Sequence, residues 1–419
     1  MRSAMNNRWP LLLALMPFMA ACSDAGADDS APRASVRDSA GVRIVENPDP
    51  AERTGWITMD AEPSVTIGVL EGAPEYQLYE VRGATRLSDG RIAVANAGSK
   101  EVRYYGADGA FLNATGRDGE GPGEFREMGM LERLPGDSVV VYDWRTRRLS
   151  LLDESGNYVA GHTIPPANSF PFPAGVLDGQ SMLIRLSRMF GGPGEEPRAG
   201  LRQDSAQYAV VPWRGEAPDS VEPSLVLPGG PMFMATGGSD GNRWMSVMTV
   251  LLAPSPSVEV RDGRVYYGLG DSYEVRVYEP TGRLIGIVRR GHTVQTVTPD
   301  MHAQAVEQNL EGIEDENWRK RQREMIEDMP VPETLPAFRE IETDEAGRLW
   351  VRRYTVGRDE PATWDVFDPE GQWLAAVPMP AGFTIHEIGR DYVLGVMRDE
   401  LEVEQLHMYG LTLAEPVEG

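Results

Sequence analysis

The chain contains 419 residues, 41% of them hydrophobic, which is enough for one large domain or two ordinary domains with a real core. Its formal net charge is −24, so its surface is strongly acidic. Such a surface repels nucleic acid and anionic lipid headgroups. We therefore expect no nucleic-acid partner and no basic patch for membrane binding.

The N-terminal residues have the composition of an export signal. Arg2 and Arg8 precede the apolar run WPLLLALMPFMAAC, which is too short to remain as a membrane-spanning helix and ends in small residues before Cys22. Cys22 is the only cysteine, so no intramolecular disulfide can form. From these residues alone, Cys22 is either a modification site or an incidental residue of an ordinary secretory signal.

Residues 19–21, Met-Ala-Ala, leading into Cys22, resemble the lipobox of bacterial lipoproteins. The resemblance implies cleavage before Cys22, lipidation of its thiol and acylation of the new amino end. We therefore expect a signal peptide over residues 1–21 and a flexible acidic tether over 22–36, with the lipid on Cys22 as the membrane anchor. The protein would then be exported and held in the bacterial cell envelope, facing the periplasm or at the cell surface; the inner and outer membranes are not distinguished.

Four stretches repeat one pattern, in which an Asp/Gly turn, a β-branched and aromatic run, a polar gap, a second alternating run and another Gly turn follow one another. They span residues 87–112, 134–159, 260–285 and 343–374, with weaker copies at 175–187 and 387–410. Units of about 40–50 residues with several strands each predict an all-β fold, a β-propeller. We expect six blades; wide spacing between some units leaves open either long insertions or a degenerate seventh blade within 200–257.

Residues 116–157 carry a glycine-rich crossing, a strand that ends in Val-x-Asp, an Arg-led strand and an Asp-x-x-Gly turn. In these features they resemble the NHL-repeat six-bladed propellers, a group within the TolB-like superfamily. The segment DSAGVRIVENP at 38–48 is similar to exported six-bladed propeller lipoproteins of bacteria. The resemblance implies a six-bladed propeller over residues 37–419, and it indicates fold more than function.

The glycine-rich stretch GRDGEGPGEF at 116–125 has a glycine content typical of a phosphate-binding loop. It lacks the Lys and the helix start that such loops use, and Asp118, Glu120 and Glu124 repel phosphate. We interpret it as the crossing from the outer strand of the first blade to the inner strand of the second, with glycines for positive φ and Phe125 as an apolar anchor between the blades. Its acidic residues should face water.

Residues that recur between repeats are candidates for architectural roles. Arg103, Arg148 and Arg276 occupy corresponding places, and we expect them to donate hydrogen bonds that join the blades. Asn96 and Asp143 also correspond. Their side chains can cap the turns that follow, or they can reach the central channel.

Two enzyme chemistries occur on propellers that resemble this chain. Six-bladed lactonases hold a channel Ca²⁺ with Glu, Asn and Asp, and Asn96 and Asp143 could supply two of those ligands, although no third can be identified. NHL-type lyases use clustered His on zinc, whereas the five histidines here are scattered without ligand spacing. We assign no catalytic residue and expect no cofactor, with Ca²⁺ only in the hydrolase alternative.

The largest interruption of the repeat, residues 297–336, predicts a helical insertion before the fifth blade. Thr298 is a suitable N-cap and Pro299 a suitable first residue, and Trp318 belongs to the apolar face of a second helical stretch. The insertion either packs on the side of the propeller or forms a lid over one mouth of the channel. The lid would include Trp318 and an adaptable apolar surface on the 228–245 stretch, made of Met232, Phe233, Met234 and Trp244.

The sequence favours binding over catalysis. We expect a monomeric, lipid-anchored extracytoplasmic propeller that binds a small molecule, a glycan or a protein partner on one face. The alternative is a metal-dependent hydrolase, such as a lactonase, or a lyase, with its site in the central channel. We also expect the alternating run PSVTIGV at 63–69 to supply the strand that the last blade lacks, which would close the ring.

Overall fold

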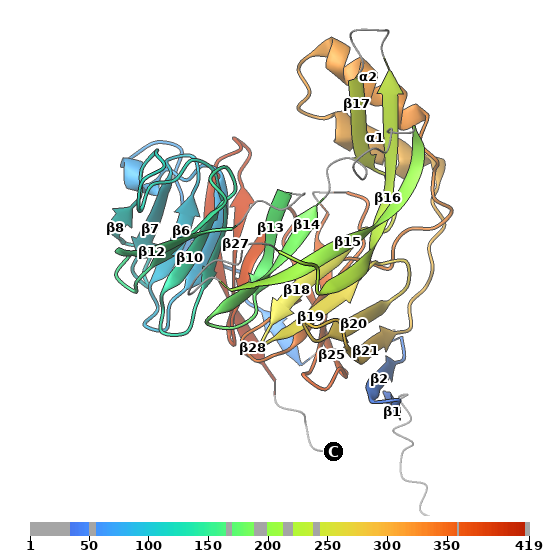
Figure 1. Cartoon of the computed structure of the whole chain (residues 1–419), viewed down its shortest axis with the longest axis horizontal. Helices are drawn as coiled ribbons and strands as arrows, with labels where there is room; N and C mark the ends of the chain where they lie inside the picture. Colours follow the sequence, from blue (N-terminus) through green and yellow to red (C-terminus); the bar gives the residue numbers. More distant parts are fainter. Residues whose placement is uncertain are drawn as a thin grey trace, which may run out of the picture. The chain divides into compact units, whose positions relative to one another are not determined.

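Antiparallel strands dominate the chain in this computed structural model, which describes residues 34–49, 56–164, 170–187, 199–212, 221–237, 244–357 and 360–414. Within these ranges the chain forms six β-sheets and two α-helices (Figure 1). None of the helices in these ranges is long and apolar enough to cross a membrane. The expected signal peptide and Cys22 lie outside the described residues.

Sheets 1 and 2 each consist of four consecutive strands. Sheet 1 contains β5 (Val81–Arg86), β6 (Ile92–Asn96), β7 (Glu101–Tyr105) and β8 (Phe111–Thr115). Sheet 2 contains β9 (Met128–Arg133), β10 (Val139–Asp143), β11 (Arg148–Leu152) and β12 (Tyr158–Thr163).

Sheets 3 and 4 are larger. Sheet 3 contains β13 (Phe170–Val176), β14 (Ser181–Ser187), β15 (Gly200–Pro212), β16 (Leu225–Gly237) and β17 (Trp244–Thr249). Sheet 4 contains β18 (Ser257–Arg261), β19 (Arg264–Gly268), β20 (Glu274–Tyr278) and β21 (Leu284–Arg290), followed by β2 (Val42–Asn47) and β1 (Ser35–Ser39). The strands within 200–249 therefore belong to sheet 3 and do not form a sheet of their own.

Sheets 5 and 6 are the last two sheets in chain order. Sheet 5 contains β22 (Phe338–Thr343), β23 (Leu349–Arg353), β24 (Ala362–Phe367) and β25 (Trp373–Met379). Sheet 6 contains β26 (Thr384–Ile388), β27 (Tyr392–Arg398) and β28 (Glu404–Leu413), and β28 also pairs with β3 (Ile57–Met59) and β4 (Val65–Ile67).

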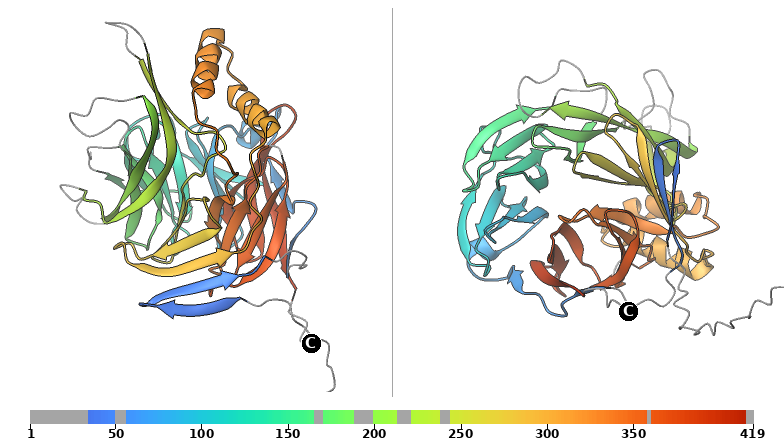
Figure 2. Two further views of the ribbon diagram at one scale, coloured as in Figure 1. Left: turned by 90° about the vertical axis from the view of Figure 1, so that its right-hand side faces the viewer. Right: turned by 90° about the horizontal axis from the view of Figure 1, so that it is seen from below.

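The first strand of each sheet faces a common centre. β5 contacts β9, β9 contacts β13, β13 contacts β18, β18 contacts β22, and β26 contacts β5. Six apolar clusters lie between neighbouring sheets, and one of them joins sheet 6 back to sheet 1. Figure 2 shows the sheets placed around this centre. A closed ring of sheets is the arrangement of a β-propeller.

Strands in the middle of a sheet are apolar on both faces because each face packs against a neighbouring sheet. All residues of β6 (IAVAN) and β10 (VVVYD) are buried. The outermost strand of sheet 2, β12, instead alternates half-buried and exposed residues. The β-branched runs that marked the repeats in the sequence are thus the strands that fill the space between sheets.

The glycine-rich stretch connects β8 to β9, as predicted. Phe125 is fully buried in the cluster between sheets 1 and 2. Gly116 has φ of 110°, and a Cβ there would lie 2.6 Å from the carbonyl oxygen of Lys100. The expectation that the acidic residues face water is wrong for Glu124, whose carboxylate accepts a 2.7 Å hydrogen bond from a backbone N–H of the loop and pairs with Arg117.

The predicted closing strand is present. β4 pairs antiparallel with β28, with Val65 opposite Met408 and Ile67 opposite Leu406. Both β4 side chains are buried in the cluster between sheets 6 and 1. An N-terminal strand therefore completes the C-terminal sheet, and β3 adds a second, unpredicted pairing with β28.

The expected tether boundary at residue 36 is wrong, because Ser35 and Val36 already belong to β1. β1 pairs with β2, which runs parallel to β21 at the outer edge of sheet 4. Ile44 and Val45 of β2 are buried there. Burial of these two side chains orders the segment, so the extended structure begins two residues earlier than the composition indicates.

Two helices precede sheet 5. α1 (Pro299–Leu310) begins where the sequence predicted, since the side chain of Thr298 accepts a hydrogen bond from the backbone N–H of Met301 at 3.3 Å. α2 (Glu316–Glu327) begins after Asp315, which accepts from the N–H of Trp318 at 2.7 Å. Both caps satisfy a backbone donor that the helix itself leaves free.

The helices pack against the long hairpin of sheet 3. Leu310, Met325 and Ile326 are buried in a small apolar cluster that also includes Phe233 of β16 and Met248 of β17. Figure 1 shows α1 and α2 beside the projecting ends of these strands.

Candidate functional site

A cavity of about 760 Å³ lies at the centre of the ring. Its walls come from the last residues of the inner strands and from the turns that follow them, including Asp137, Asp178, Asp262 and Glu345. α1 and α2 instead join the end of β21 to the start of β22. The helices therefore belong to the opposite end of the ring and do not cover this cavity.

One strand position supplies a glutamate in four of the six sheets. This position is on the first strand of each sheet, two residues before the residue that pairs with the second strand across the following turn. Thr85 occupies it in sheet 1 and Gly175 in sheet 3. We name the four acidic residues the channel glutamates: Glu132 of β9, Glu259 of β18, Glu342 of β22 and Glu387 of β26, all of which line the cavity.

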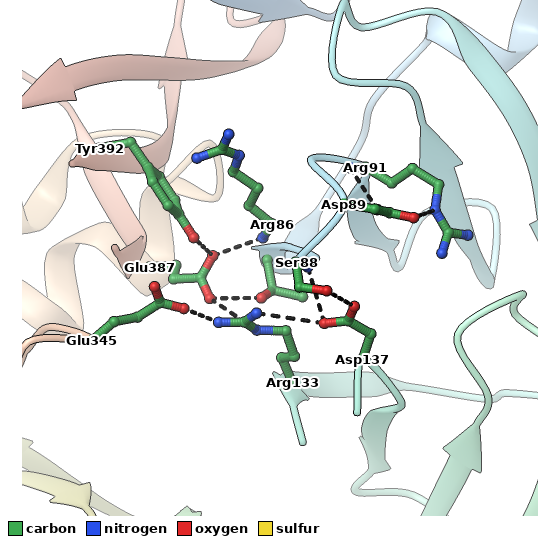
Figure 3. Close-up of polar contacts among 10 residues, drawn as sticks. Arg86, Ser88, Asp89, Arg91, Arg133, Asp137, Glu345, Glu387 and Tyr392 are labelled. Carbon is green, nitrogen blue, oxygen red and sulfur yellow. Dashed lines mark hydrogen bonds and ion pairs between the residues drawn. The ribbon is translucent and has the colours of Figure 1, made fainter. Parts of the chain in front are cut away.

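Glu387 is held by several donors (Figure 3). Its Oε1 accepts a 2.7 Å hydrogen bond from the Thr85 hydroxyl. Its Oε2 accepts from the backbone N–H of Arg86 at 2.7 Å and from the Tyr392 hydroxyl at 2.8 Å. Because these donors come from β5 and from β27 of its own sheet, Glu387 joins sheet 6 to sheet 1.

Arg133 extends this network to two more sheets. Its guanidinium lies 3.5 Å from Asp137 of its own sheet and 3.9 Å from Glu387, and it pairs with Glu345, which follows β22. Figure 3 shows the Arg133 side chain between these carboxylates. The charges at this side of the cavity are thus paired with one another.

The other three channel glutamates have few partners. Glu132 accepts one hydrogen bond, from the backbone N–H of Val176 at 2.9 Å, and Glu259 accepts one from the Thr343 hydroxyl at 2.7 Å. The carboxyl group of Glu342 has no hydrogen bond or ion pair with any other residue that the structure describes. Most of the oxygen lone pairs in this group therefore remain available.

Burial and mutual repulsion change the ionisation of these carboxyl groups. Burial raises the pKa of Glu259 to about 7, and the nearby Glu132 adds to the rise. Burial also raises the pKa of Glu342 well above its usual value, with Glu259 adding to it, and burial raises the pKa of Glu132. Glu259 and Glu342 therefore retain protons to higher pH than an ordinary glutamate, and a protonated carboxyl can donate as well as accept a hydrogen bond.

Two basic side chains face the same space. Arg261 lies close enough to oppose the rise in the pKa of all three carboxyl groups, yet it forms no ion pair with another described residue. The Nε2 atom of His386 is buried without a hydrogen-bond partner in the described structure, and burial lowers the pKa of His386 to about 4. His386 is therefore neutral at pH 7, and its Nε2 atom lies buried in the wall of the cavity.

Asn96 and Asp143 are buried, and neither lines the cavity. Asn96 accepts from the backbone N–H of Tyr79 at 2.7 Å and donates to Ser99 at 2.8 Å. Asp143 accepts from the backbone N–H groups of residues 126, 127 and 146. Both side chains therefore cap the turns that follow their strands, and the described residues contain no group of three or more His, Cys, Asp or Glu arranged to hold a metal ion.

The recurring arginines have different roles. Arg103 donates to the backbone carbonyls of residues 74, 75 and 77, and Arg148 donates to those of residues 120 and 124. Arg276 instead pairs with Glu274 beside it and is partly exposed. Two of the three thus fasten loops to their sheets.

The predicted lid residues lie away from the cavity. Met232, Phe233 and Met234 belong to β16, Trp244 begins β17 and Trp318 belongs to α2. Phe233 packs against the helices, while Trp318 is 42% exposed beside the guanidinium of Arg321. The helices thus pack against β16 and β17 and do not cover the central cavity.

Sequence reasoning missed the channel glutamates, Arg261 and His386. A signal was present, because a glutamate recurs just before the turn in LERLPGD, VEVRDG, IETDEAG and HEIGRD. The recurring polar residues identified from the sequence lie on later strands of each repeat, whereas the channel glutamates lie on the first strand, which faces the centre.

No protein-family model and no curated protein matches the chain. Among solved structures it is similar to a member of the DUF4221 family from Bacteroides vulgatus, with 9% identity, 86% of this chain and 100% of that chain covered, and a TM-score of 0.52. Weaker likenesses include the calcium-binding protein regucalcin from Agrobacterium tumefaciens (11% identity, 88% and 99% covered, TM-score 0.36) and virginiamycin B lyase from Staphylococcus aureus (11%, 80% and 97%, 0.37). At these identities a likeness concerns the fold alone.

Proposed function

We propose that the chain is an exported, lipid-anchored six-bladed β-propeller whose central cavity binds a small polar molecule that carries a cationic group, such as a protonated amine. The signal-like N-terminus and the residues before Cys22 support export and lipidation. Six sheets separated by six apolar clusters support six blades, and the glycine-rich crossing supports a place among NHL-repeat and TolB-like propellers. The protein would act as a monomer.

One observation carries the proposal: three carboxyl groups from three different sheets, Glu132, Glu259 and Glu342, meet in one cavity where the protein gives them few hydrogen bonds. Placing carboxylates together in a partly enclosed cavity is unfavourable unless a proton or another cation accompanies them. A cationic ligand can replace those protons. The cavity volume of about 760 Å³ suits an organic molecule better than a bare ion.

The remaining polar groups would orient the rest of the molecule. Arg261, which lines the cavity, can donate to an acceptor on the ligand. Arg133 and Glu387 are already paired with one another and with their neighbours, so they would fix the wall and would not bind the ligand.

Calorimetric titration tests the proposal with glucosamine, putrescine and ethanolamine as probes and with N-acetylglucosamine as a neutral control. The protein used starts at residue 34, and we expect saturable binding of at least one amine and none of the control. The E259Q/E342Q variant should weaken that binding at least tenfold, whereas E71Q, at an exposed glutamate, should leave it unchanged. Equal binding by E259Q/E342Q and wild type would contradict the proposal.

A parallel Ca²⁺ titration addresses the metal-dependent hydrolase or lyase alternative. One tightly bound equivalent of Ca²⁺ that E259Q/E342Q loses, together with no amine binding, would favour that alternative.

A further inference from the structure

A second cavity, of about 470 Å³, lies between α1 and the propeller. The segment 248–255, which leads from β17 to β18, forms one wall, and Gln308 and Asn309 of α1 form another. Arg339 of β22 and Tyr354, just after β23, lie on the third side. This cavity is at the end of the ring where β18 and β22 begin, away from the channel glutamates.

The wall made by residues 248–255 is fixed by backbone hydrogen bonds. The N–H of Val250 donates to the carbonyl of Pro231 at 3.1 Å, and the N–H of Ala253 donates to the carbonyl of Val250 at 3.2 Å. Leu252 between them has φ of 59°, a left-handed conformation that a residue with a branched side chain rarely adopts. Such conformations persist where the surrounding structure holds them, and they concentrate at binding sites.

The lining combines apolar and polar side chains and contains one charged residue, Arg339. Arg339 is exposed at the edge of the cavity and forms no ion pair with another described residue. Arg339 lies close enough to Tyr354 for its charge to oppose the rise that burial causes in the pKa of that hydroxyl. The chain has a net charge of −24, so a guanidinium without a described ion-pair partner beside a partly apolar cavity is a local attraction for an anion.

We infer that this cavity binds an amphiphilic carboxylate, whose anionic group pairs with Arg339 and whose apolar part lies against Leu251 and Val356. The amides of Gln308 and Asn309 and the Tyr354 hydroxyl can donate to the remaining carboxylate lone pairs. The site is separate from the central cavity, and its ligand has the opposite charge. It gives α1 a second role, as one wall of a binding site.

Calorimetric titration with decanoate below its micelle concentration tests this inference, and decanol serves as the uncharged probe. We expect one saturable site for decanoate and at least tenfold weaker binding of decanol. R339Q should weaken decanoate binding at least tenfold, whereas R321Q, an arginine of α2 that does not line the cavity, should not change it. A305W, which fills the cavity from α1, should abolish binding.

Melting curves accompany each variant, so that loss of the fold is separated from loss of the site. Absence of saturable binding by the wild-type protein, or equal binding by wild type and R339Q, would overturn the inference. Equal affinity for decanoate and decanol would also overturn it, because the carboxylate would then have no role.

Discussion

The Thr343 hydroxyl donates a 2.7 Å hydrogen bond to Oε1 of Glu259, so a residue of sheet 5 holds a carboxyl group of sheet 4 inside the central cavity. The same kind of contact recurs two sheets away on either side, where Glu132 accepts from Val176 and Glu387 accepts from Thr85. Alternate sheets therefore present a glutamate to the next sheet. Glu342 stands outside this scheme, because no such contact from the next sheet stabilises its carboxyl group.

Replacing Thr343 by valine should destabilise the protein more at pH 8 than at pH 5. The hydroxyl stabilises the ionised form of Glu259 and so lowers its pKa against the effect of burial. A hydrogen bond to a charged group contributes about 1.5–3 kcal/mol, and a neutral one about 1 kcal/mol. Urea denaturation of T343V and wild type at both pH values measures the difference; an equal loss at pH 5 and pH 8 would contradict the assignment.

The E259Q/E342Q variant should change how the stability of the protein depends on pH. Since the pKa of each carboxyl is raised in the folded state, the folded protein retains protons that the unfolded chain releases between pH 4.5 and about 7. The free energy of unfolding then falls as pH rises, by about 1.4 kcal/mol per pH unit for each proton retained.

The decrease in the free energy of unfolding with rising pH should be smaller in E259Q/E342Q than in wild type. Urea denaturation from pH 5 to pH 8 measures it. His386 acts in the opposite direction, because its lowered pKa makes stability rise with pH between about 4 and 6.5. The variant retains His386, Glu132, Arg261 and Arg133, so the difference between the two profiles isolates the substituted carboxyls. Parallel profiles would show that these carboxyls ionise normally.

Because β4 closes the ring, a substitution of a buried residue in this strand should strongly reduce the stability of the protein. Ile67 is 2% exposed in the cluster between sheets 6 and 1, so I67A should cost about 2–5 kcal/mol of stability. V69A serves as the control, because Val69 is 39% exposed and follows the strand. Equal urea midpoints for the two variants would mean that β4 contributes little to the closed fold.

The glycine-rich crossing can be tested by a matched pair of glycines. Gly116 and Gly382 both have positive φ, but a Cβ would meet the Lys100 carbonyl at the former and nothing within 4 Å at the latter. G382A should cost about 1 kcal/mol for the backbone conformation alone, and G116A should cost clearly more. Thermal melting of both variants decides the point, and a G116A loss no larger than that of G382A would show that the crossing can relax.

The sequence allowed the sheets to be predicted because the apolar runs have to fill the space between them. The same argument found the closing strand at 63–69 and the cap at Thr298, where the local pattern alone determines the structure. The argument from apolar runs did not predict β1, because the residues of β1 are exposed and are ordered by pairing with β2. The tether boundary therefore depended on a contact made by a distant part of the chain.

The site was harder to predict for a physical reason. The three glutamates of the site, Glu132, Glu259 and Glu342, are far apart in sequence. Each of them, taken alone, has the pattern of an ordinary surface residue of a short strand. Only the ring brings them to one cavity, where burial and their mutual repulsion alter their ionisation. Asn96 and Asp143 were candidate channel residues because they recur at corresponding places. Their recurrence instead reflects the same turn formed in two sheets.

Proton release on amine binding is the most direct test of the central claim. A pH-indicator dye in a weakly buffered solution at pH 7 reports protons that leave the cavity when glucosamine or putrescine is added to wild type and to E259Q/E342Q. If the ligand's cationic group replaces protons on Glu259 and Glu342, wild type should release protons in proportion to the fraction of sites filled, and E259Q/E342Q should release far fewer per bound amine. Saturable amine binding by wild type without proton release, or equal release per bound amine by wild type and E259Q/E342Q, would contradict it.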